Sequence, residues 1–252
     1  MNYIYDGSFE GFLTAIFDSY PYIEKASIAR QRDQLNFFKD SIFIATDEEK
    51  AKRVAEAISQ KLSNTFYRDL KLSFLSKEED KETVAARVVK NTFKFGLTYL
   101  LSSEKNAVDF RSMVKNIRSE NHSYKGLLRF SKLKNGFLFA KIRPENDLIE
   151  ILLPHFIDRL VNEKFIIYDE GRKKCVIYYK GEYRIFEIDN INIDYDSSEE
   201  LITQAWINFY NSVTIIDRRN LNLMKANMPI RYWEYLPERR STNERIKRNK
   251  DS

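Results

Sequence analysis

The residues best suited to chemistry are the arginines and aromatic rings gathered toward the C-terminal end of the chain. The run MPIRYWEYLPE sets an arginine directly beside a tyrosine and a tryptophan, and the run DRRN precedes it by a short spacer. A guanidinium makes charge-assisted contacts with phosphate oxygens, and an aromatic ring stacks on a base with about 1–3 kcal/mol per base. This combination predicts contact with nucleic acid. The candidate residues are Arg218, Arg219, Arg231, Tyr232 and Trp233.

A structural interpretation of the same rings stays open. In that interpretation Trp233 and Tyr235 pack on the core, and Pro229 and Pro237 fix an extended crossing.

The net charge of the chain is confined to the same region. From Ile215 to Ser252 there are ten Lys or Arg and five Asp or Glu, an excess that equals the +5 of the whole chain. A basic segment interleaved with aromatic residues is typical of proteins that bind a polyanion, above all nucleic acid. We expect residues 239–252 to form a basic disordered tail that adds salt-sensitive, non-specific attraction.

A second polar group occurs in the run ENHSYKGLLRF. His122, Lys125 and Arg129 are expected at a junction between a helix and a strand, where Gly126 lets the backbone bend. Such a loop can grip phosphate, with His122 as a proton donor or acceptor. The alternative is a solvated junction whose cations only face water. Lys125 and Arg129 therefore join the nucleic-acid-binding candidates, and His122 is a catalytic candidate.

A third group lies in the run IRPENDLIEILLPHFIDRL. Here Asp147, Glu150 and Asp158 could join His155 in acid–base chemistry or weak metal binding. Asp169, farther along the chain, is a further carboxylate that could act with His122 or His155. The simpler alternative is that Asp147 begins a helix, Asp158 and Arg159 form a surface pair worth little, and His155 belongs to the core. The catalytic candidates are His122, His155, Asp147 and Asp169.

The chain lacks the motifs that would identify a reaction. It has no phosphate-binding P-loop, no dinucleotide-binding glycine motif, no nucleophile elbow and no zinc-protease or deaminase signature. Cys175 is the single cysteine, which excludes an internal disulfide and a cysteine-based metal cage. We expect neither a metal site nor a cofactor. No apolar run approaches the roughly 20 residues that span a bilayer, and the start resembles no signal peptide, so a cytoplasmic protein without a membrane partner is expected.

The predicted helices and strands that position these residues form two regions, which meet near residue 120. Residues 1–120 are predicted to be mainly helical with a short two-strand element. The apolar spacing places strands over 3–5 and 41–46, and helices over 9–20, 47–61, 65–75, 79–101 and 108–120. Ser8 and Thr46 are the expected N-caps of the first two helices.

Residues 121–238 are predicted to form an α+β region. Strands are expected over 127–130, 137–142, 164–168, 174–179 and 183–188, with a helix over 147–160 after the second of them. This β-β-α-β-β-β order favours an antiparallel sheet that carries a helix. Helices over 197–212 and 217–226 follow, before an extended MPIRYW segment. The fold class is therefore α+β.

Four runs of the sequence are similar to the hallmarks of one bacterial family. They are the opening YDGSFEGFLTAIF, the central HSYKGLLRF and PHFIDR, and the closing RRN with MPIRYWEYLPE. On these runs the chain resembles the family described as "probable DNA metabolism protein", a domain of unknown function. The resemblance covers about residues 1–238. The matching positions are Tyr5, Asp6, Gly7, Ser8, Gly11, His122, Lys125, Gly126, Arg129, Pro144, Asp147, His155, Phe156, Arg159, Asp169, Arg218, Arg219, Asn220, Pro229, Tyr232 and Trp233.

The resemblance implies a biological context without a reaction. Members of that family occur beside a radical-SAM protein assigned to DNA modification or repair, and in other members a similar domain is fused to a uracil-DNA glycosylase-like domain. We therefore expect an accessory protein of bacterial DNA repair or modification that binds single-stranded DNA or a damaged duplex and acts with a radical-SAM partner. Two alternatives stay open: an enzyme that acts on a nucleotide or base through His122 or His155 with a carboxylate, and a protein-interaction adaptor without direct DNA contact.

Overall fold

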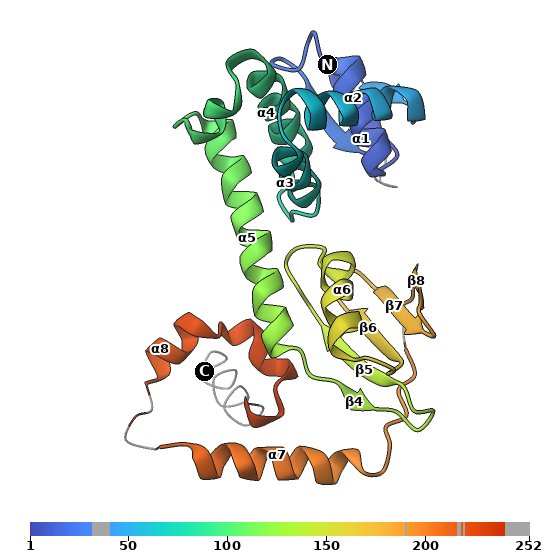
Figure 1. The fold of residues 1–252 in the computed structure, drawn as a ribbon, viewed down its shortest axis with the longest axis vertical. Helices are drawn as coiled ribbons and strands as arrows, with labels where there is room; N and C mark the ends of the chain where they lie inside the picture. Colours follow the sequence, from blue (N-terminus) through green and yellow to red (C-terminus); the bar gives the residue numbers. More distant parts are fainter. Residues whose placement is uncertain (32–40, 190, 216–217, 219, 240–252) are drawn as a thin grey trace. The chain divides into compact units, whose positions relative to one another are not determined.

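The computed structural model describes residues 1–31, 41–189, 191–215, 218 and 220–239 (Figure 1). The chain divides into two compact units, Met1–Ser119 (unit 1) and Glu120–Ser252 (unit 2). Helix α5 (Lys105–Leu127) begins in unit 1, and its last turns belong to unit 2. The combination of helices with a three-stranded and a five-stranded sheet confirms the α+β prediction.

Unit 1 is built on a small parallel sheet. Strand β1 (Asn2–Tyr5) is central and pairs in parallel with β2 (Ser27–Arg30) and with β3 (Ser41–Ile44). Two of these strands were predicted and β2 was missed, because four residues that end in an arginine give no alternating apolar pattern. The remaining elements are α1 (Phe9–Ser19), α2 (Glu48–Lys61), α3 (Asn64–Phe74), α4 (Lys81–Phe95), the 3-10 helix η1 (Leu97–Leu101) and the start of α5.

Several helix boundaries in unit 1 differ from the sequence prediction, and two of them have a clear local cause. The N-cap of α2 is Asp47, whose carboxylate accepts from the Lys50 amide at 3.0 Å, while the predicted cap Thr46 donates its hydroxyl to Asp6 instead. The long helix predicted over 79–101 ends at Gly96, which adopts φ +78° and so breaks the helix before η1.

Gly11 is required by close packing at the start of α1. The Asp6 carboxylate accepts from the Ser8 amide at 2.9 Å, the Ser8 hydroxyl at 2.6 Å and the Thr46 hydroxyl at 2.7 Å. A Cβ on Gly11 would lie 2.3 Å from Asp6 Oδ1 and 2.8 Å from Thr46 Oγ1. These hydrogen bonds hold the Asp6 carboxylate and the Thr46 hydroxyl against Gly11. Neither group can therefore move aside without losing a hydrogen bond.

We expect Gly11→Ala to lower the free energy of unfolding by about 1–3 kcal/mol, the usual cost of inserting a methyl group into a packed site. Chemical denaturation measures this value. Gly126→Ala is the matched control, because Gly126 lies in a helix and a Cβ there meets no atom within 4 Å. Asp6, Ser8 and Thr46 form what we call the Asp6 cluster. If the Gly11→Ala variant were as stable as the natural chain, this cluster would be free to rearrange around the added methyl group.

Unit 2 is built on a five-stranded sheet in the order β4-β5-β6-β7-β8. The strands are β4 (Ser131–Lys132), β5 (Leu138–Ile142), β6 (Phe165–Asp169), β7 (Lys174–Tyr179) and β8 (Glu182–Glu187). All neighbours pair antiparallel except β5 and β6, which are parallel. The sheet is therefore mixed, a correction to the antiparallel prediction. Helix α6 (Ile149–Arg159) lies between β5 and β6 in the chain, and a helical crossover returns the second strand in the same direction.

The sheet of unit 2 has apolar residues on both faces. On one face Phe139, Tyr168 and Cys175 are buried with Leu133, and on the other the buried side chains of α6 lie against β7. The strand predicted over 127–130 is absent, because α5 continues through Leu127 before β4 begins.

Cys175 provides a reporter for the folding of unit 2. Its side chain is 1% exposed, and burial raises the pKa of the thiol to about 11. The thiolate is the nucleophile in thiol chemistry, so we expect no reaction with a thiol reagent near neutral pH until unit 2 unfolds. A colorimetric thiol assay with and without denaturant tests this. Rapid labelling of the native protein would contradict the buried position of Cys175.

The C-terminal part of unit 2 is helical where the structure describes it. It contains α7 (Glu199–Val213), α8 (Leu221–Asn227) and two 3-10 helices, η3 (Ile230–Tyr235) and η4 (Pro237–Arg239). The segment predicted to be extended is thus η3. Of the predicted tail 239–252, residues 240–252 lie outside the described residues. Among the described residues, no helix has the length and apolar character needed to cross a membrane.

Candidate functional site

A hollow in unit 2 gathers residues from the two central motifs. It has a volume of about 440 Å³, within the range of small-ligand sites. Its walls come from the end of α5 and the loop after it, the end of α6, and α7. We call it the arginine hollow; its lining residues are Gly126, Leu128, Arg129, Phe130, Phe156, Arg159, Leu160 and Trp206.

Aromatic packing fixes one wall of the arginine hollow. The ring of Phe130 meets Phe156 edge-on with centroids 5.3 Å apart, and meets Phe165 in the same way at 5.8 Å. Phe156 belongs to α6 and Phe165 to β6, so this contact ties the segment after α5 to the core of unit 2. The motifs HSYKGLLRF and PHFIDR are therefore brought together by burial of their phenylalanines.

Arg129 is held in place by several contacts at the edge of the hollow. Its Nη1 donates to the carbonyl of Gly126 at 3.0 Å, and its Nη2 lies 3.8 Å from Glu238 Oε1. The guanidinium lies 5.7 Å from the ring centroid of Trp206, and the indole Nε1 donates to Glu238 Oε2 at 2.9 Å. The Glu238 side chain, only 6% exposed, thus binds both groups. It fixes a cation and an indole side by side.

Arg159 is the freer cation of the hollow. It is exposed in the last turn of α6, and it forms no ion pair with any residue that the structure describes. Trp206 is 39% exposed, so part of the indole is open to solvent. The hollow thus offers one unpaired guanidinium, one fixed guanidinium and one accessible aromatic ring. An anion attached to a planar ring matches this set of groups.

The neighbouring candidates His122 and Lys125 lie in the last two turns of α5. His122 is exposed and Lys125 is half-buried, and the two are three residues apart, as are neighbours on one helix face. Neither lines the arginine hollow. They extend the basic character of the HSYKG motif toward solvent.

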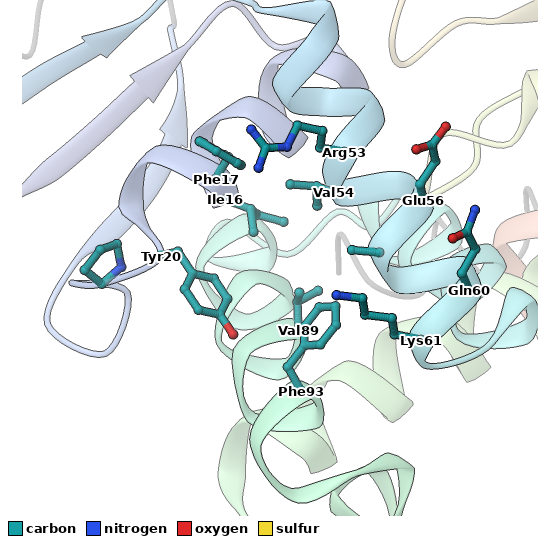
Figure 2. A pocket seen from close by; sticks show the side chains of 12 residues that line it. Ile16, Phe17, Tyr20, Arg53, Val54, Glu56, Gln60, Lys61, Val89 and Phe93 are labelled. Atoms are coloured by element: carbon teal, nitrogen blue, oxygen red, sulfur yellow. The ribbon is translucent and has the colours of Figure 1, made fainter.

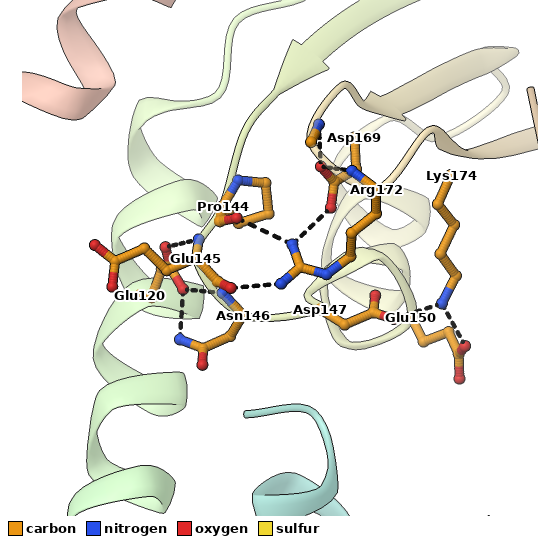
Figure 3. A network of polar contacts seen from close by, with 10 residues as sticks. Glu120, Pro144, Glu145, Asn146, Asp147, Glu150, Asp169, Arg172 and Lys174 are labelled. Carbon is orange, nitrogen blue, oxygen red and sulfur yellow. Dashed lines mark hydrogen bonds and ion pairs between the residues drawn. The ribbon is translucent and has the colours of Figure 1, made fainter. Parts of the chain in front are cut away.

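A separate polar network occupies the loop between β5 and α6 (Figure 3). The buried Glu120 carboxylate accepts from the Glu145 amide at 2.8 Å, the Asn146 amide at 3.0 Å and Asn146 Nδ2 at 2.7 Å. Arg231, from η3, pairs with Glu145 and lies 3.8 Å from Glu120. The arginine that the sequence assigned to nucleic acid is therefore engaged with two carboxylates inside its own chain.

The carboxylate candidates for catalysis also belong to this network. Buried Asp169 accepts from the amides of Gly171 at 2.9 Å and Arg172 at 3.2 Å, and pairs with the Arg172 guanidinium at 3.1 Å. Burial raises the pKa of Asp169, while Arg172 acts against that rise. Arg172 also donates to the carbonyls of Pro144 and Glu145. The contacts identify Asp169 as a brace between the β6–β7 turn and the loop before α6.

Asp147 is held in a similar way. Its Oδ2 lies 2.9 Å from the Lys174 ammonium, which also lies 3.1 Å from Glu150 Oε1. Burial lowers the pKa of Lys174, but the hydrogen bonds to Asp147 and Glu150 outweigh this and raise it overall. Among the described residues, no hydrogen bond or ion pair joins His122 or His155 to Asp147 or Asp169, and no group of three potential metal ligands occurs.

The rings of the MPIRYW motif are in the interior. Trp233 is 0% exposed and donates its Nε1 to the Met228 carbonyl at 2.9 Å, and Tyr232 is 2% exposed against the ring of Tyr124. Neither offers an open face for a base in this conformation. Arg218 is exposed, and Arg219 lies outside the described residues.

A larger hollow in unit 1 has a different character (Figure 2). It measures about 620 Å³ and is lined mainly by apolar side chains of α1, α2 and α4, among them Ile16, Val54 and Val89. Arg53 and Lys61 lie at its rim with Glu56, and the Arg53 guanidinium is 5.2 Å from the ring centroid of Phe17. Its two cations thus lie beside a carboxylate, whereas Arg159 of the arginine hollow forms no ion pair with any described residue.

One family model matches the chain, over residues 79–238, and is described as a domain of unknown function, DUF4130. The chain belongs to this family. No curated protein matches the chain.

The DUF4130 region contains the arginine hollow and the polar network of Figure 3 completely. The Asp6 cluster lies before it. The two sites of unit 2 therefore belong to the part of the chain by which the family is defined.

Of the residues that line the arginine hollow, only Arg129 was in the predicted binding set, and its polar neighbours Arg159 and Trp206 were not. Arg159 matched a motif of the resembling family but was interpreted as half of a surface pair with Asp158. Trp206 gave no signal, because a tryptophan in an amphipathic helix is usually a core residue. Its indole is held by a hydrogen bond to Glu238, which is 32 residues away in the chain.

Proposed function

We propose that unit 2 binds single-stranded nucleic acid, with one nucleotide seated in the arginine hollow. The observation that carries this proposal is the convergence of Arg129, Arg159 and the exposed indole of Trp206 on one cavity. A base would stack on Trp206, and the flanking phosphates would meet Arg159 and Arg129. A duplex keeps its bases stacked inside, so an unpaired strand or a disrupted duplex fits this arrangement better.

The biological setting that we propose is DNA repair or modification in bacteria. Its support is the resemblance of HSYKGLLRF, PHFIDR and MPIRYWEYLPE to the family described as "probable DNA metabolism protein". That resemblance also supports an accessory role beside a radical-SAM partner. The basic excess between Ile215 and Ser252 would add sequence-independent attraction to the backbone.

The enzymatic alternative has less support. It needs His122 or His155 to act with Asp147 or Asp169, but both carboxylates are paired with cations of their own unit. We therefore propose binding in preference to catalysis.

Fluorescence anisotropy with a labelled oligonucleotide tests the proposal. We expect the full chain to bind a single strand more tightly than a matched duplex, with an affinity that falls as salt rises. A chain truncated after Arg239 separates the two contributions: it should lose affinity for both forms alike and keep its preference for the single strand. Absence of binding at low salt, or an equal affinity for both forms, would refute the proposal.

A further inference from the structure

The hollow of unit 1, which we call the unit 1 hollow, has a base of aliphatic side chains (Figure 2). Ile16 of α1 is 1% exposed and Val89 of α4 is fully buried. Val54 and Ala57 of α2 are half-buried and also line it. Its volume of about 620 Å³ lies within the range of sites that enclose small molecules. The nucleic-acid site proposed for unit 2 does not include it, so it is a candidate site for a different ligand.

One cation points into the unit 1 hollow without a counterion. Figure 2 shows the Lys61 side chain directed toward Val89 and Phe93. Glu56 lies on the same rim, but its carboxylate is turned away from Lys61. Lys61 forms no ion pair with any residue that the structure describes. Because a charge beside apolar surface is stabilised by an opposite charge, an anion in the hollow would supply the missing partner.

A phenol group approaches the hollow from another side. Tyr20 follows the last turn of α1, and Figure 2 shows its hydroxyl directed toward Val89. Burial raises the pKa of Tyr20, so the hydroxyl keeps its proton at neutral pH and can donate it in a hydrogen bond. Lys61 and Tyr20 thus both offer donors to a small anion, and the two oxygens of a carboxylate accept from such groups.

The lining of the unit 1 hollow restricts the rest of the ligand. A cation would be repelled by Lys61 and by Arg53, which has no ion pair within the described part of the chain. A nucleobase would leave the polar groups of its edge unpaired against aliphatic side chains, which costs affinity. An alkyl chain gains from burial against the same side chains. One inward ammonium matches one negative charge.

We propose that the unit 1 hollow binds a medium-chain carboxylic acid. The alkyl chain lies on the base formed by Ile16 and Val89, and the carboxylate lies between Lys61 and Tyr20. This site belongs to unit 1 alone and does not depend on the binding of nucleic acid by unit 2.

Isothermal titration calorimetry of the full chain tests the proposal with octanoate, octanol and octylamine, which share an alkyl chain and differ in charge. We expect octanoate to bind most tightly, octanol more weakly and octylamine least. Shorter acids should lose about two- to fourfold in affinity for each methylene removed, because each methylene is buried against the aliphatic base. Equal binding of octanoate and octylamine, or no binding of octanoate at millimolar concentration, would overturn the proposal.

Two variants locate the ligand within the hollow. Lys61→Gln should weaken octanoate binding about tenfold, the effect of losing a charge-assisted hydrogen bond, and leave octanol binding unchanged. Lys52→Gln is the matched control, because Lys52 is an exposed lysine of the same helix and does not line the hollow. Ala57→Leu narrows the hollow and should weaken octanoate and octanol alike. Equal effects of the two lysine variants, or unchanged octanoate binding in Ala57→Leu, would contradict the assigned site.

Discussion

Replacement of Trp233 by alanine is expected to lower the free energy of unfolding of unit 2 by about 3–5 kcal/mol, the range for large aromatic residues in cores. The indole is fully buried, and its Nε1 donates to the Met228 carbonyl at 2.9 Å. Removal of the ring leaves both a cavity and an unpaired carbonyl. Denaturant unfolding monitored through the reaction of Cys175 with a thiol reagent measures the loss of stability in unit 2 alone.

Trp206→Ala is the matched control, because the chain contains only these two tryptophans. Trp206 is 39% exposed, and its removal breaks one hydrogen bond, to Glu238, so about 1 kcal/mol is expected. The two variants should affect different properties: Trp233→Ala should mainly reduce the stability of unit 2, and Trp206→Ala should mainly reduce the affinity for nucleic acid. If Trp233→Ala were as mild as Trp206→Ala, η3 would not belong to the core.

The second large effect is expected from Arg159→Glu, which should weaken single-strand binding about tenfold or more. A hydrogen bond to a charged group contributes about 1.5–3 kcal/mol, and about 1.4 kcal/mol corresponds to tenfold in affinity. Arg159 is exposed and pairs with no described carboxylate, so its replacement should cost no more than about 1 kcal/mol of stability, the effect of a reversed charge in the last turn of a helix. Anisotropy titrations at low salt measure the affinity.

The control for Arg159→Glu is Arg184→Glu, because Arg184 is an exposed residue of β8 and does not line the hollow. Both variants change the net charge equally. An equal loss of affinity in the two would mean that binding depends on the total charge of the chain and does not involve the hollow. Arg129 is a poorer probe, because it also holds the Gly126 carbonyl and Glu238.

The elements with strong periodicity were predictable from the sequence. The helices at 9–20 and 47–61 and the strands at 164–168, 174–179 and 183–188 agree with the structure within one or two residues. The local sequence pattern could not predict β2. This strand is stabilised by parallel pairing with β1 and by the hydrogen bond from Arg30 to Glu82 at 2.7 Å. The same holds for the parallel pairing of β5 with β6, which depends on the direction of the α6 crossover.

The candidate site was predictable only in part. The motif HSYKGLLRF indicated Arg129, and the resemblance included Gly126, Phe156 and Arg159. The aromatic contact was assigned to Tyr232 and Trp233, since a tryptophan beside an arginine looks the same in sequence whether it is buried or open. Burial of Tyr232 depends on a distant partner, the ring of Tyr124, which the local sequence does not indicate. Trp233 is fully buried and donates to the nearby Met228 carbonyl, whereas Trp206 stays partly exposed.

The emission of Trp206 tests the central claim most directly. In the variant Trp233→Phe, which keeps most of the buried ring, Trp206 is the sole tryptophan, and protection of Cys175 verifies that unit 2 is folded. Titration with an unlabelled single strand should quench this emission in parallel with the binding measured by anisotropy, because a base stacks on the indole. If the oligonucleotide binds and the emission of Trp206 does not change, the nucleotide does not occupy the arginine hollow.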